Sequence, residues 1–235
     1  REYTSLTPDK KGGVRSYGDA LRKIPNTLRG VDPAVAPDGE TVAFFEYTDG
    51  TLNLVTIKKD GSDKTYLTSF NDGTWMQRVD WSPDGKHLVF QMFRNYRYDL
   101  WKIDADGSNL TPLTWDRVEE LDVHWAKDGR IYFSADPTGI FNIFAMDVET
   151  RTISQITNVV SAAQLPFLTP EGNLLYVQFT AHGSKAMGLH RSEFLERDAT
   201  HLFGLETPEA EPLESFITFE EDLTHFAEST RTYKP

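Results

Sequence analysis

Residues 79–85 read Val79-Asp80-Trp81-Ser82-Pro83-Asp84-Gly85, and related stretches occur at three other places in the chain. These stretches cover residues 32–39, 123–129 and 166–172, and each ends in an acidic residue followed by glycine. The four glycines are Gly39, Gly85, Gly129 and Gly172, so the sequence repeats about every 44 residues. A fixed period of this length is typical of repeat folds such as propellers and solenoids.

Two other columns of residues keep the same spacing. An aromatic residue follows each turn, and a Leu-Thr or Ile-Thr pair closes the first three repeats. The aromatic residues are Phe44, Phe90, Phe133 and Tyr176, and the pairs are Leu67-Thr68, Leu113-Thr114 and Ile156-Thr157. Because independent columns share one period, we interpret them as one structural unit repeated along the chain.

Each repeat predicts four short antiparallel strands. Pro-Asp-Gly suits the tight turn between the first two strands, since proline fixes φ and glycine accepts a positive φ. Asp60-Gly61 and Asp106-Gly107 lie between stretches of alternating apolar residues, a pattern that predicts hairpins. Such a sheet has two apolar faces, and radial stacking of several sheets covers both. We therefore predict an all-β propeller of four-stranded blades, with about four blades at residues 30–74, 75–118, 119–162 and 163–196.

The composition of the 235 residues excludes several classes of function. Lys and Arg number 24 against 36 Asp and Glu, which gives a net charge of -12, whereas a general nucleic-acid binder needs a basic surface. The absence of cysteine excludes disulfides, thiolate zinc sites and cysteine nucleophiles. No apolar run reaches the roughly 20 residues of a transmembrane helix, so we expect none in this chain.

The repeat resembles the blades of TolB-type β-propellers. The resemblance rests on residues 79–86, 99–107 and 113–114, and it extends over about residues 30–196. It implies a six-bladed ring, of which the four repeats would form a part. It also implies a non-catalytic protein-binding scaffold in the bacterial periplasm or at the outer-membrane-associated cell surface. The implied partners are other envelope proteins, such as a peptidoglycan-associated lipoprotein or an outer-membrane complex.

A second interpretation stays open, in which the chain is the substrate-gating propeller of a prolyl-oligopeptidase or tricorn-type serine peptidase. Such propellers are not catalytic themselves, and they accompany a separate α/β domain. This chain has no Gly-x-Ser-x-Gly elbow, and its six histidines lack the His-Glu-x-x-His spacing of zinc sites. The sequence therefore predicts no catalytic residue in this chain.

Polar residues of the first strands are the candidates for a site in the central channel. They are Asp32, Arg78, Asp80, Asp122 and His124. Because the first strand of a propeller blade lines the channel, these side chains are expected to converge there. The favoured interpretation is an internal salt-bridge network, in which Arg78 pairs with a neighbouring aspartate. The alternative is a weak calcium site, with Asp32, Asp80, Asp122 and His124 as candidate ligands, because carboxylate oxygens suit hard cations.

A basic and aromatic stretch at residues 91–98 is the candidate for contact with a partner. The residues that we single out are Arg94, Tyr96, Arg97 and Tyr98. Arginine and tyrosine are enriched at the centres of protein interfaces. The competing interpretation is that the tyrosines pack within a hairpin.

The two ends differ from the repeats. Residues 197–235 are acidic, and we expect an extension or linker there. Residues 1–29 are expected to be the end of a preceding blade followed by a linker, because Ser5-Leu6-Thr7 matches the closing Leu-Thr of a repeat. The favoured explanation is that an upstream blade precedes this chain. The other explanation is that residues 1–7 supply the outer strand of the last blade and close the ring.

Overall fold

The computed structural model describes residues 4–8, 14–16, 23–94 and 96–205. Its blades are antiparallel sheets in which consecutive strands are neighbours. Blade 1 consists of β3 (Gly30–Val35), β4 (Thr41–Thr48), β5 (Thr51–Lys58) and β6 (Thr65–Tyr66), and blade 2 of β7 (Trp75–Trp81), β8 (His87–Arg94), β9 (Arg97–Asp104) and β10 (Thr111–Pro112). Blade 3 consists of β11 (Glu120–Trp125), β12 (Arg130–Ala135), β13 (Asn142–Asp147) and β14 (Ile153–Gln155), and blade 4 of β15 (Ala162–Leu168), β16 (Leu174–Thr180) and β17 (Gly183–Leu189).

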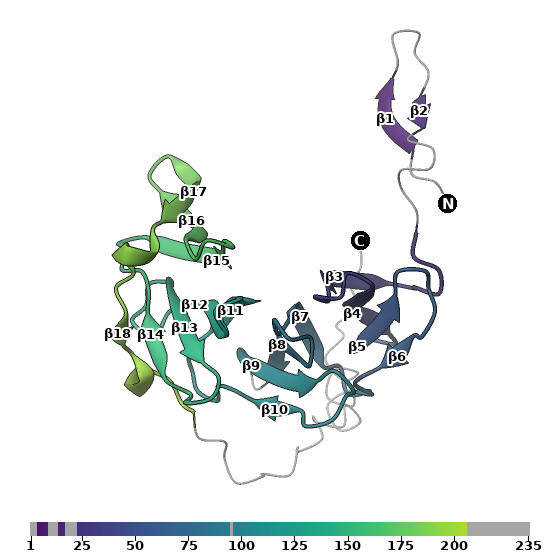
Figure 1. Cartoon of the computed structure of the whole chain (residues 1–235), viewed down its shortest axis with the longest axis horizontal. Coiled ribbons are helices and arrows are strands. Elements are labelled where there is room, and N and C mark those ends of the chain that lie inside the picture. Colours follow the sequence, from purple (N-terminus) through teal and green to yellow (C-terminus); the bar gives the residue numbers. More distant parts are fainter. Residues whose placement is uncertain (1–3, 9–13, 17–22, 95, 206–235) are drawn as a thin grey trace, which may run out of the picture.

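The four blades follow one another along an arc, with the first strand of each blade on its inner side (Figure 1). The prediction of an all-β propeller with about four blades is confirmed, and the described blades do not close a ring. A separate two-stranded sheet of β1 (Thr4–Pro8) and β2 (Val14–Ser16) stands away from the blades in the same view.

Apolar residues from facing blades form the core at each junction. The junction between blades 1 and 2 buries residues such as Phe45, Leu54 and Phe90. The next junction contains Phe133 and Phe144, and the third contains Tyr132 and Leu174. The strands β4, β5, β8, β12 and β13 are buried along nearly their whole length, and most of their residues are apolar.

Trp81 and Trp125 occupy equivalent places at the ends of β7 and β11. Their exposed fractions are only 6% and 8%, and both pack within the junctions between blades. The indole of Trp81 donates to the carbonyl of Ala34 in the preceding blade at 3.2 Å, whereas Trp125 donates to Gly129 in its own turn at 3.2 Å. The repeated tryptophan is therefore a core residue in both blades.

The chain leaves blade 4 after β17 and returns to blade 3. It makes the 3-10 turn η2 (Arg191–Glu193), adds β18 (Arg197–Asp198) to the outer edge of β14 and continues into the 3-10 turn η3 (Thr200–Leu202). We call residues 190–205 the strap. The sequence placed residues 197–205 in an extension outside the blades, but the structure packs them on blade 3, and residues 206–235 lie outside the described part of the chain.

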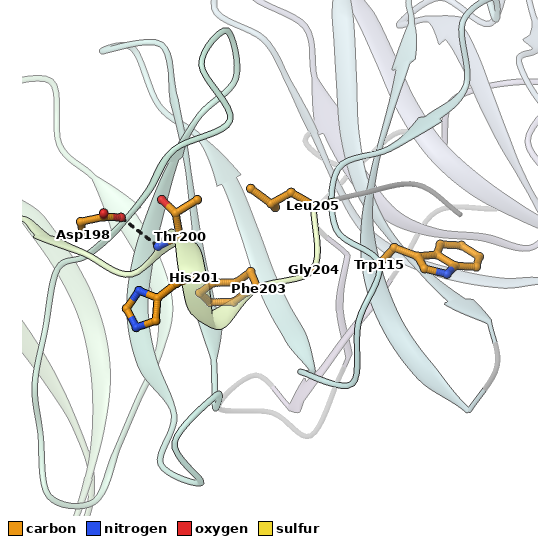
Figure 2. A pocket seen from close by; sticks show the side chains of 7 residues that line it. All are labelled: Trp115, Asp198, Thr200, His201, Phe203, Gly204 and Leu205. Carbon is orange, nitrogen blue, oxygen red and sulfur yellow. Dashed lines mark hydrogen bonds between the residues drawn. The ribbon is translucent and has the colours of Figure 1, made fainter. Parts of the chain in front are cut away.

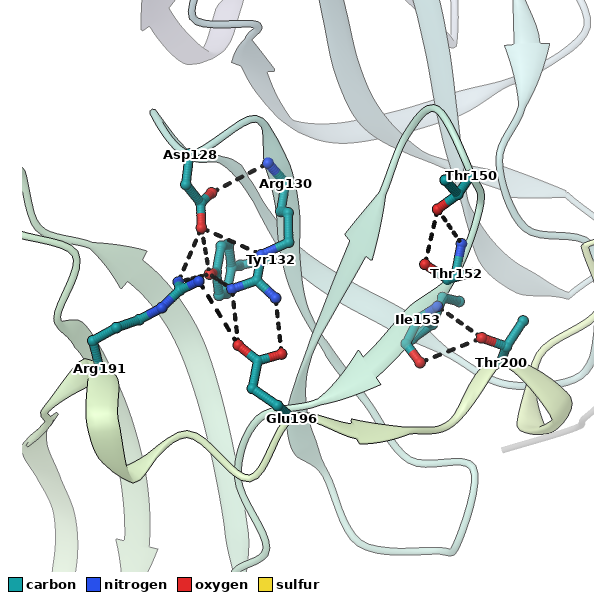
Figure 3. A network of polar contacts seen from close by, with 9 residues as sticks. All are labelled: Asp128, Arg130, Tyr132, Thr150, Thr152, Ile153, Arg191, Glu196 and Thr200. Atoms are coloured by element: carbon teal, nitrogen blue, oxygen red, sulfur yellow. Dashed lines mark hydrogen bonds and ion pairs between the residues drawn. The ribbon is translucent and has the colours of Figure 1, made fainter.

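Ion pairs hold the strap to blade 3 (Figure 3). Arg130 lies 3.0 Å from Glu196, and Arg191 lies 3.0 Å from Asp128. The hydroxyl of Tyr132 donates to Asp128 at 2.9 Å between these two pairs. The network joins residues that are more than 55 positions apart in the sequence, so it fixes where the chain returns.

Candidate functional site

Each inner strand contains a bulge at the same column of the repeat. Asp32, Arg78, Asp122 and Leu165 adopt positive φ values of 49°, 57°, 57° and 57°, and the strand register shifts at each of them. The Asp32 carboxylate accepts a hydrogen bond from the backbone N–H of Arg78 at 3.0 Å, and Asp122 accepts one from Leu165 at 3.2 Å. The aspartates of this column therefore bind the bulge of the following blade.

The remaining candidates for the channel lie beside this column. Arg78 lies 3.6 Å from Asp122 across the junction of blades 2 and 3. Asp80 Oδ2 lies 2.7 Å from His124 Nδ1, and the His124 ring stacks on Phe167 with 4.9 Å between ring centres. The structure thus brings the five predicted residues to the inner strands and joins them by hydrogen bonds and ion pairs. Within the described ranges, no group of three His, Asp or Glu residues is placed to hold a metal.

A row of aromatic side chains crosses blade 2 at the end where β8 turns into β9. Trp75, Phe93 and Tyr98 are successive cross-strand partners on β7, β8 and β9. The rings of Phe93 and Tyr98 are 5.1 Å apart, and Tyr47 of blade 1 meets Trp75 edge-on at 6.3 Å. Trp75 is 45% exposed, so this aromatic row (Tyr47, Trp75, Phe93 and Tyr98) is partly open to solvent.

Tyr96 extends the aromatic surface at the tip of the hairpin. A two-residue turn joins Arg94 and Arg97, and Tyr96 takes a φ of 64° in it. Its side chain is 88% exposed, whereas the other exposed aromatic side chains of the described ranges are at most 50% exposed. A positive φ is uncommon for an aromatic residue, so the hairpin displays this tyrosine at a conformational cost.

Arg97 faces the interior more than the sequence suggested. Its Nε lies 3.2 Å from the buried carboxylate of Asp99, and its guanidinium lies 5.3 Å from the ring centre of Trp115. Tyr98 packs on Phe93, and burial raises its pKa. Of the four candidate contact residues, Tyr96 is therefore displayed and Tyr98 joins the aromatic row, while Arg97 is tied to Asp99. The side chain of Arg94 lies outside the described part of the structure.

Sequence reasoning missed a pair of buried acids behind the aromatic row. Asp99 and Glu120 are both fully buried, and desolvation raises the pKa of Asp99 to about 6 and that of Glu120 well above its usual value. Glu120 accepts a hydrogen bond from the hydroxyl of Thr114 at 2.8 Å. The signal was present in the repeat, because Asp99 replaces the asparagine found at Asn53 and Asn142.

A hollow of about 660 Å³ lies between the strap and blade 2 (Figure 2). Its lining residues are Trp115, Asp198, Thr200, His201, Phe203, Gly204 and Leu205. Asp198 accepts the backbone N–H of Thr200 at 2.9 Å, so its carboxylate caps a turn. The hydroxyl of Thr200 accepts the backbone N–H of Ile153 at 2.9 Å, so this residue also holds the strap to β14.

No helix in the described ranges has both the length and the apolar character needed to cross a membrane. The comparisons with known proteins agree with the fold. The chain is 25% identical over 158 residues to an uncharacterized protein of Agrobacterium fabrum, covering 66% of this chain and 53% of that protein. It is 29% identical over 120 residues to the Tol-Pal system protein TolB of Anaeromyxobacter dehalogenans, covering 51% of this chain and 26% of that protein.

Solved structures with the same fold include TolB from Acinetobacter baumannii, with a TM-score of 0.61 and 18% identity over 81% of this chain and 47% of that one. They also include puromycin hydrolase, with a TM-score of 0.58 and 16% identity over 86% of this chain and 32% of that one. The chain thus spans about half the length of the Agrobacterium protein and of the Acinetobacter TolB. The family described as the TolB beta propeller domain matches residues 22–190, and the chain belongs to this family.

Proposed function

We propose that this chain is a non-catalytic protein-binding scaffold of the bacterial cell envelope, and that it binds its partner through the aromatic row and Tyr96. The observation that carries the proposal is the exposure of Trp75 and Tyr96 beside the packed rings of Phe93 and Tyr98. Rigid aromatic side chains lose little entropy on binding, and they dominate the centres of protein interfaces.

The placement in the envelope rests on the relatives. One of them is a Tol-Pal system protein, and a peptidoglycan-associated lipoprotein is the partner that the resemblance suggested. The contact surface lies on a rigid sheet, because the residues behind it, such as Met76 and Met92, are buried between blades. A preformed surface of this kind needs little rearrangement on binding.

The test is the affinity of the chain for the purified soluble domain of a peptidoglycan-associated lipoprotein, measured by biolayer interferometry. Trp75→Ala and Tyr96→Ala should each weaken binding by about tenfold or more, as for central interface aromatics. Leu195→Ala is the matched control, because Leu195 is a similarly exposed apolar residue on the strap. Equal affinities of all three variants would contradict the aromatic row as the contact surface.

The peptidase interpretation remains a second candidate, supported by the shared fold of puromycin hydrolase and by a tricorn protease homolog among the relatives, which is 26% identical over 153 residues. In that case the propeller would act beside a catalytic domain of a longer protein. Adding the purified chain to the separately expressed catalytic domain of such a peptidase would then restrict cleavage to shorter peptides. The scaffold proposal expects no change in the cleavage of any peptide.

A further inference from the structure

A second hollow, of about 530 Å³, lies between blades 2 and 3. Blade 2 contributes the turn after β7 together with His87 and Lys102, and blade 3 contributes Trp125 and the turns after β11 and β13. The hollow lies at the end of the blades where β8 begins, whereas the aromatic row lies where β8 turns into β9. It is therefore separate from the proposed contact surface, and its volume is in the range of small-molecule sites.

The corresponding hollow between blades 1 and 2 has a different chemical character. It measures about 330 Å³, and the repeated tryptophan lines both hollows. The positions of His87 and Lys102 are occupied in blade 1 by Thr41 and Thr56, 46 residues earlier. The repeat thus forms a hollow at both junctions, but of these two only the junction of blades 2 and 3 places an imidazole and an ammonium group in it.

The imidazole of His87 is held in one orientation from two sides. Its Nδ1 lies 2.7 Å from Oδ1 of Asp104, and its ring stacks on Trp125 with 6.1 Å between ring centres and 16° between ring planes. Hydrogen bonds from Asn109 and His87 lower the pKa of Asp104, so this carboxylate is ionised at neutral pH and accepts the Nδ1 proton. Nε2 is then the nitrogen available to a ligand, and it becomes a donor when the ring takes up a second proton.

Lys102 lies beside His87 on the same face of blade 2. Asp104 is the cross-strand partner of His87, and Lys102 precedes Asp104 by two positions, so both β9 side chains point to one side of the sheet. Diagonal neighbours of this kind are about 7–8 Å apart, a distance that a lysine side chain spans. Lys127 lines the opposite wall, in the turn after β11. Three groups that can carry positive charge therefore line one hollow.

Most carboxylates around this hollow are already bound by other groups of the chain. Asp84 accepts a hydroxyl of its own turn at 2.7 Å, and Asp147 accepts the backbone N–H of Thr150 at 2.8 Å. Asp128 lies 3.3 Å from Arg130 and is also paired with an arginine of the strap (Figure 3). These carboxylates are therefore compensated by their own partners.

The charges of the lining that remain unpaired are mostly positive. Among the residues that the structure describes, Lys102 and Lys127 form no ion pair, and Glu149 is the carboxylate of the lining without a cationic partner. This local excess of positive charge stands in a chain whose net charge is -12. A hollow of this kind favours an anion over a cation.

We propose that this hollow is a binding site for a small organic anion. His87 Nε2 and the ammonium groups of Lys102 and Lys127 bind its carboxylate or phosphate group through charge-assisted hydrogen bonds. Its apolar part lies against Trp125 and Val148, which line the same hollow. The site does not depend on the aromatic row, because the two lie at opposite ends of blade 2.

Titration of the full chain with small anions, followed by two-dimensional NMR, tests the site. The probes are inorganic phosphate, succinate and N-acetyl-phenylalanine at constant ionic strength. The reporter is the indole N–H of Trp125, which donates to Gly129 at 3.2 Å, and its signal should shift and saturate. The amide of N-acetyl-phenylalanine lacks the charge and should leave the signal in place. Tighter binding of phosphate would identify a phosphate ligand, and tighter binding of the two carboxylates a carboxylate ligand.

Variants of the lining separate a built site from attraction by any lysine. Lys102→Met and His87→Gln should each weaken the best-bound probe by about fivefold or more, because each removes a charge-assisted hydrogen bond. Lys102→Arg keeps the charge and should retain most of the affinity. Lys86→Met is the matched control, since Lys86 lies outside the lining, 75% exposed and 3.7 Å from Asp84. Its affinity should stay within about twofold of the unchanged chain.

Three results would overturn the proposal. Equal losses in Lys86→Met and Lys102→Met would show attraction by net charge alone. Equal binding of the acid and its amide would show that no anion is recognised, and the absence of a saturable shift with all three probes would show that no anion binds. Because Lys102 is partly exposed and forms no ion pair with the described residues, its variants test the site even where loss of the bond between His87 and Asp104 lowers stability.

Discussion

Asp80 of β7 and His124 of β11 are joined across the junction between blades 2 and 3. Asp80 Oδ2 lies 2.7 Å from His124 Nδ1, and the same oxygen accepts the backbone N–H of Trp125 at 3.0 Å. Asp32 and Asp122 bind the following blade in a comparable way, through the N–H groups of Arg78 and Leu165. Each of the three described junctions therefore has an aspartate that receives hydrogen bonds from the next inner strand.

Removal of this carboxylate should loosen the junction. Asp80→Ala leaves the Trp125 N–H and His124 without their acceptor, and it should lower the free energy of unfolding by about 1–2 kcal/mol. Asp106→Ala is the control, since Asp106 hydrogen-bonds only within its own turn, to Ser108 at 2.9 and 2.6 Å. Urea denaturation measures both variants, and equal losses would show that the bonds across the junction add nothing.

The same aspartates give a prediction about calcium. Because Asp32, Asp80 and Asp122 already accept hydrogen bonds from protein groups, a cation would have to displace those donors. Addition of calcium at millimolar concentration should therefore leave the melting midpoint within about 1 °C of its value without calcium. A ligand that binds only the folded chain would instead raise the free energy of unfolding by roughly 2.7 kcal/mol at a concentration of a hundred times its Kd. A clear rise that Asp122→Asn abolishes would instead support the weak channel site.

The blades were predictable because their pattern is local and repeated. Each Pro-Asp-Gly or Asp-Gly turn specifies its own hairpin. The aromatic residues Phe44, Phe90 and Phe133 follow these turns at the spacing of the repeat, so they mark the second strand of each blade. Trp81 and Trp125 also stand 44 residues apart at one position of the repeat, and both are buried in the core.

The strap and the buried acids were not predictable in this way. The return of residues 190–205 to blade 3 depends on contacts between distant residues, such as Arg130 with Glu196, which no local period reveals. Likewise, Arg97 is less exposed than Tyr96 because its Nε lies 3.2 Å from the buried carboxylate of Asp99, a contact that the local sequence does not reveal. A basic and aromatic loop indicated a contact surface, but tertiary structure selected which of its residues face the solvent.

The tryptophans provide a comparison between core and surface positions. Trp81→Ala should lower the free energy of unfolding by about 3–5 kcal/mol, because it leaves a cavity between blades 1 and 2. Trp75→Ala, at a position 45% exposed on the same strand, should cost less than about 1 kcal/mol. Thermal and urea unfolding of the two variants measure the difference. Similar losses would show that Trp75 is a core residue and would weaken its role as a contact residue.

Asp99 should make the stability of the chain depend on pH. Its pKa is raised by burial to about 6 in the folded state, against 3.8 for the ordinary group, so the folded chain holds this proton more tightly than the unfolded chain. Stability should therefore fall as the pH rises from about 4 to above 6, by at most about 3 kcal/mol from this residue at 1.36 kcal/mol per pH unit. Glu120, whose pKa is also raised, adds to the fall in the same direction.

Substitution at Asp99 separates its part of this pH dependence from that of Glu120. The counterpart Asn53 accepts the hydroxyl of Thr68 at 3.0 Å and the N–H of Phe70 at 2.7 Å, and Asn142 binds Thr157 and Val159 in the same way. In blade 2 the hydroxyl of Thr114 donates to Glu120 instead, but the backbone N–H of Asp116 donates to Asp99. Asp99→Asn keeps the acceptor for this N–H without a buried charge, so it should be more stable than the unchanged chain at pH 8 and similar to it at pH 4. The reverse change, Asn142→Asp, should lose stability at pH 8 and regain much of it in acid. Urea unfolding across this pH range tests both, and a parallel pH profile for Asp99→Asn and the unchanged chain would assign the effect to other groups.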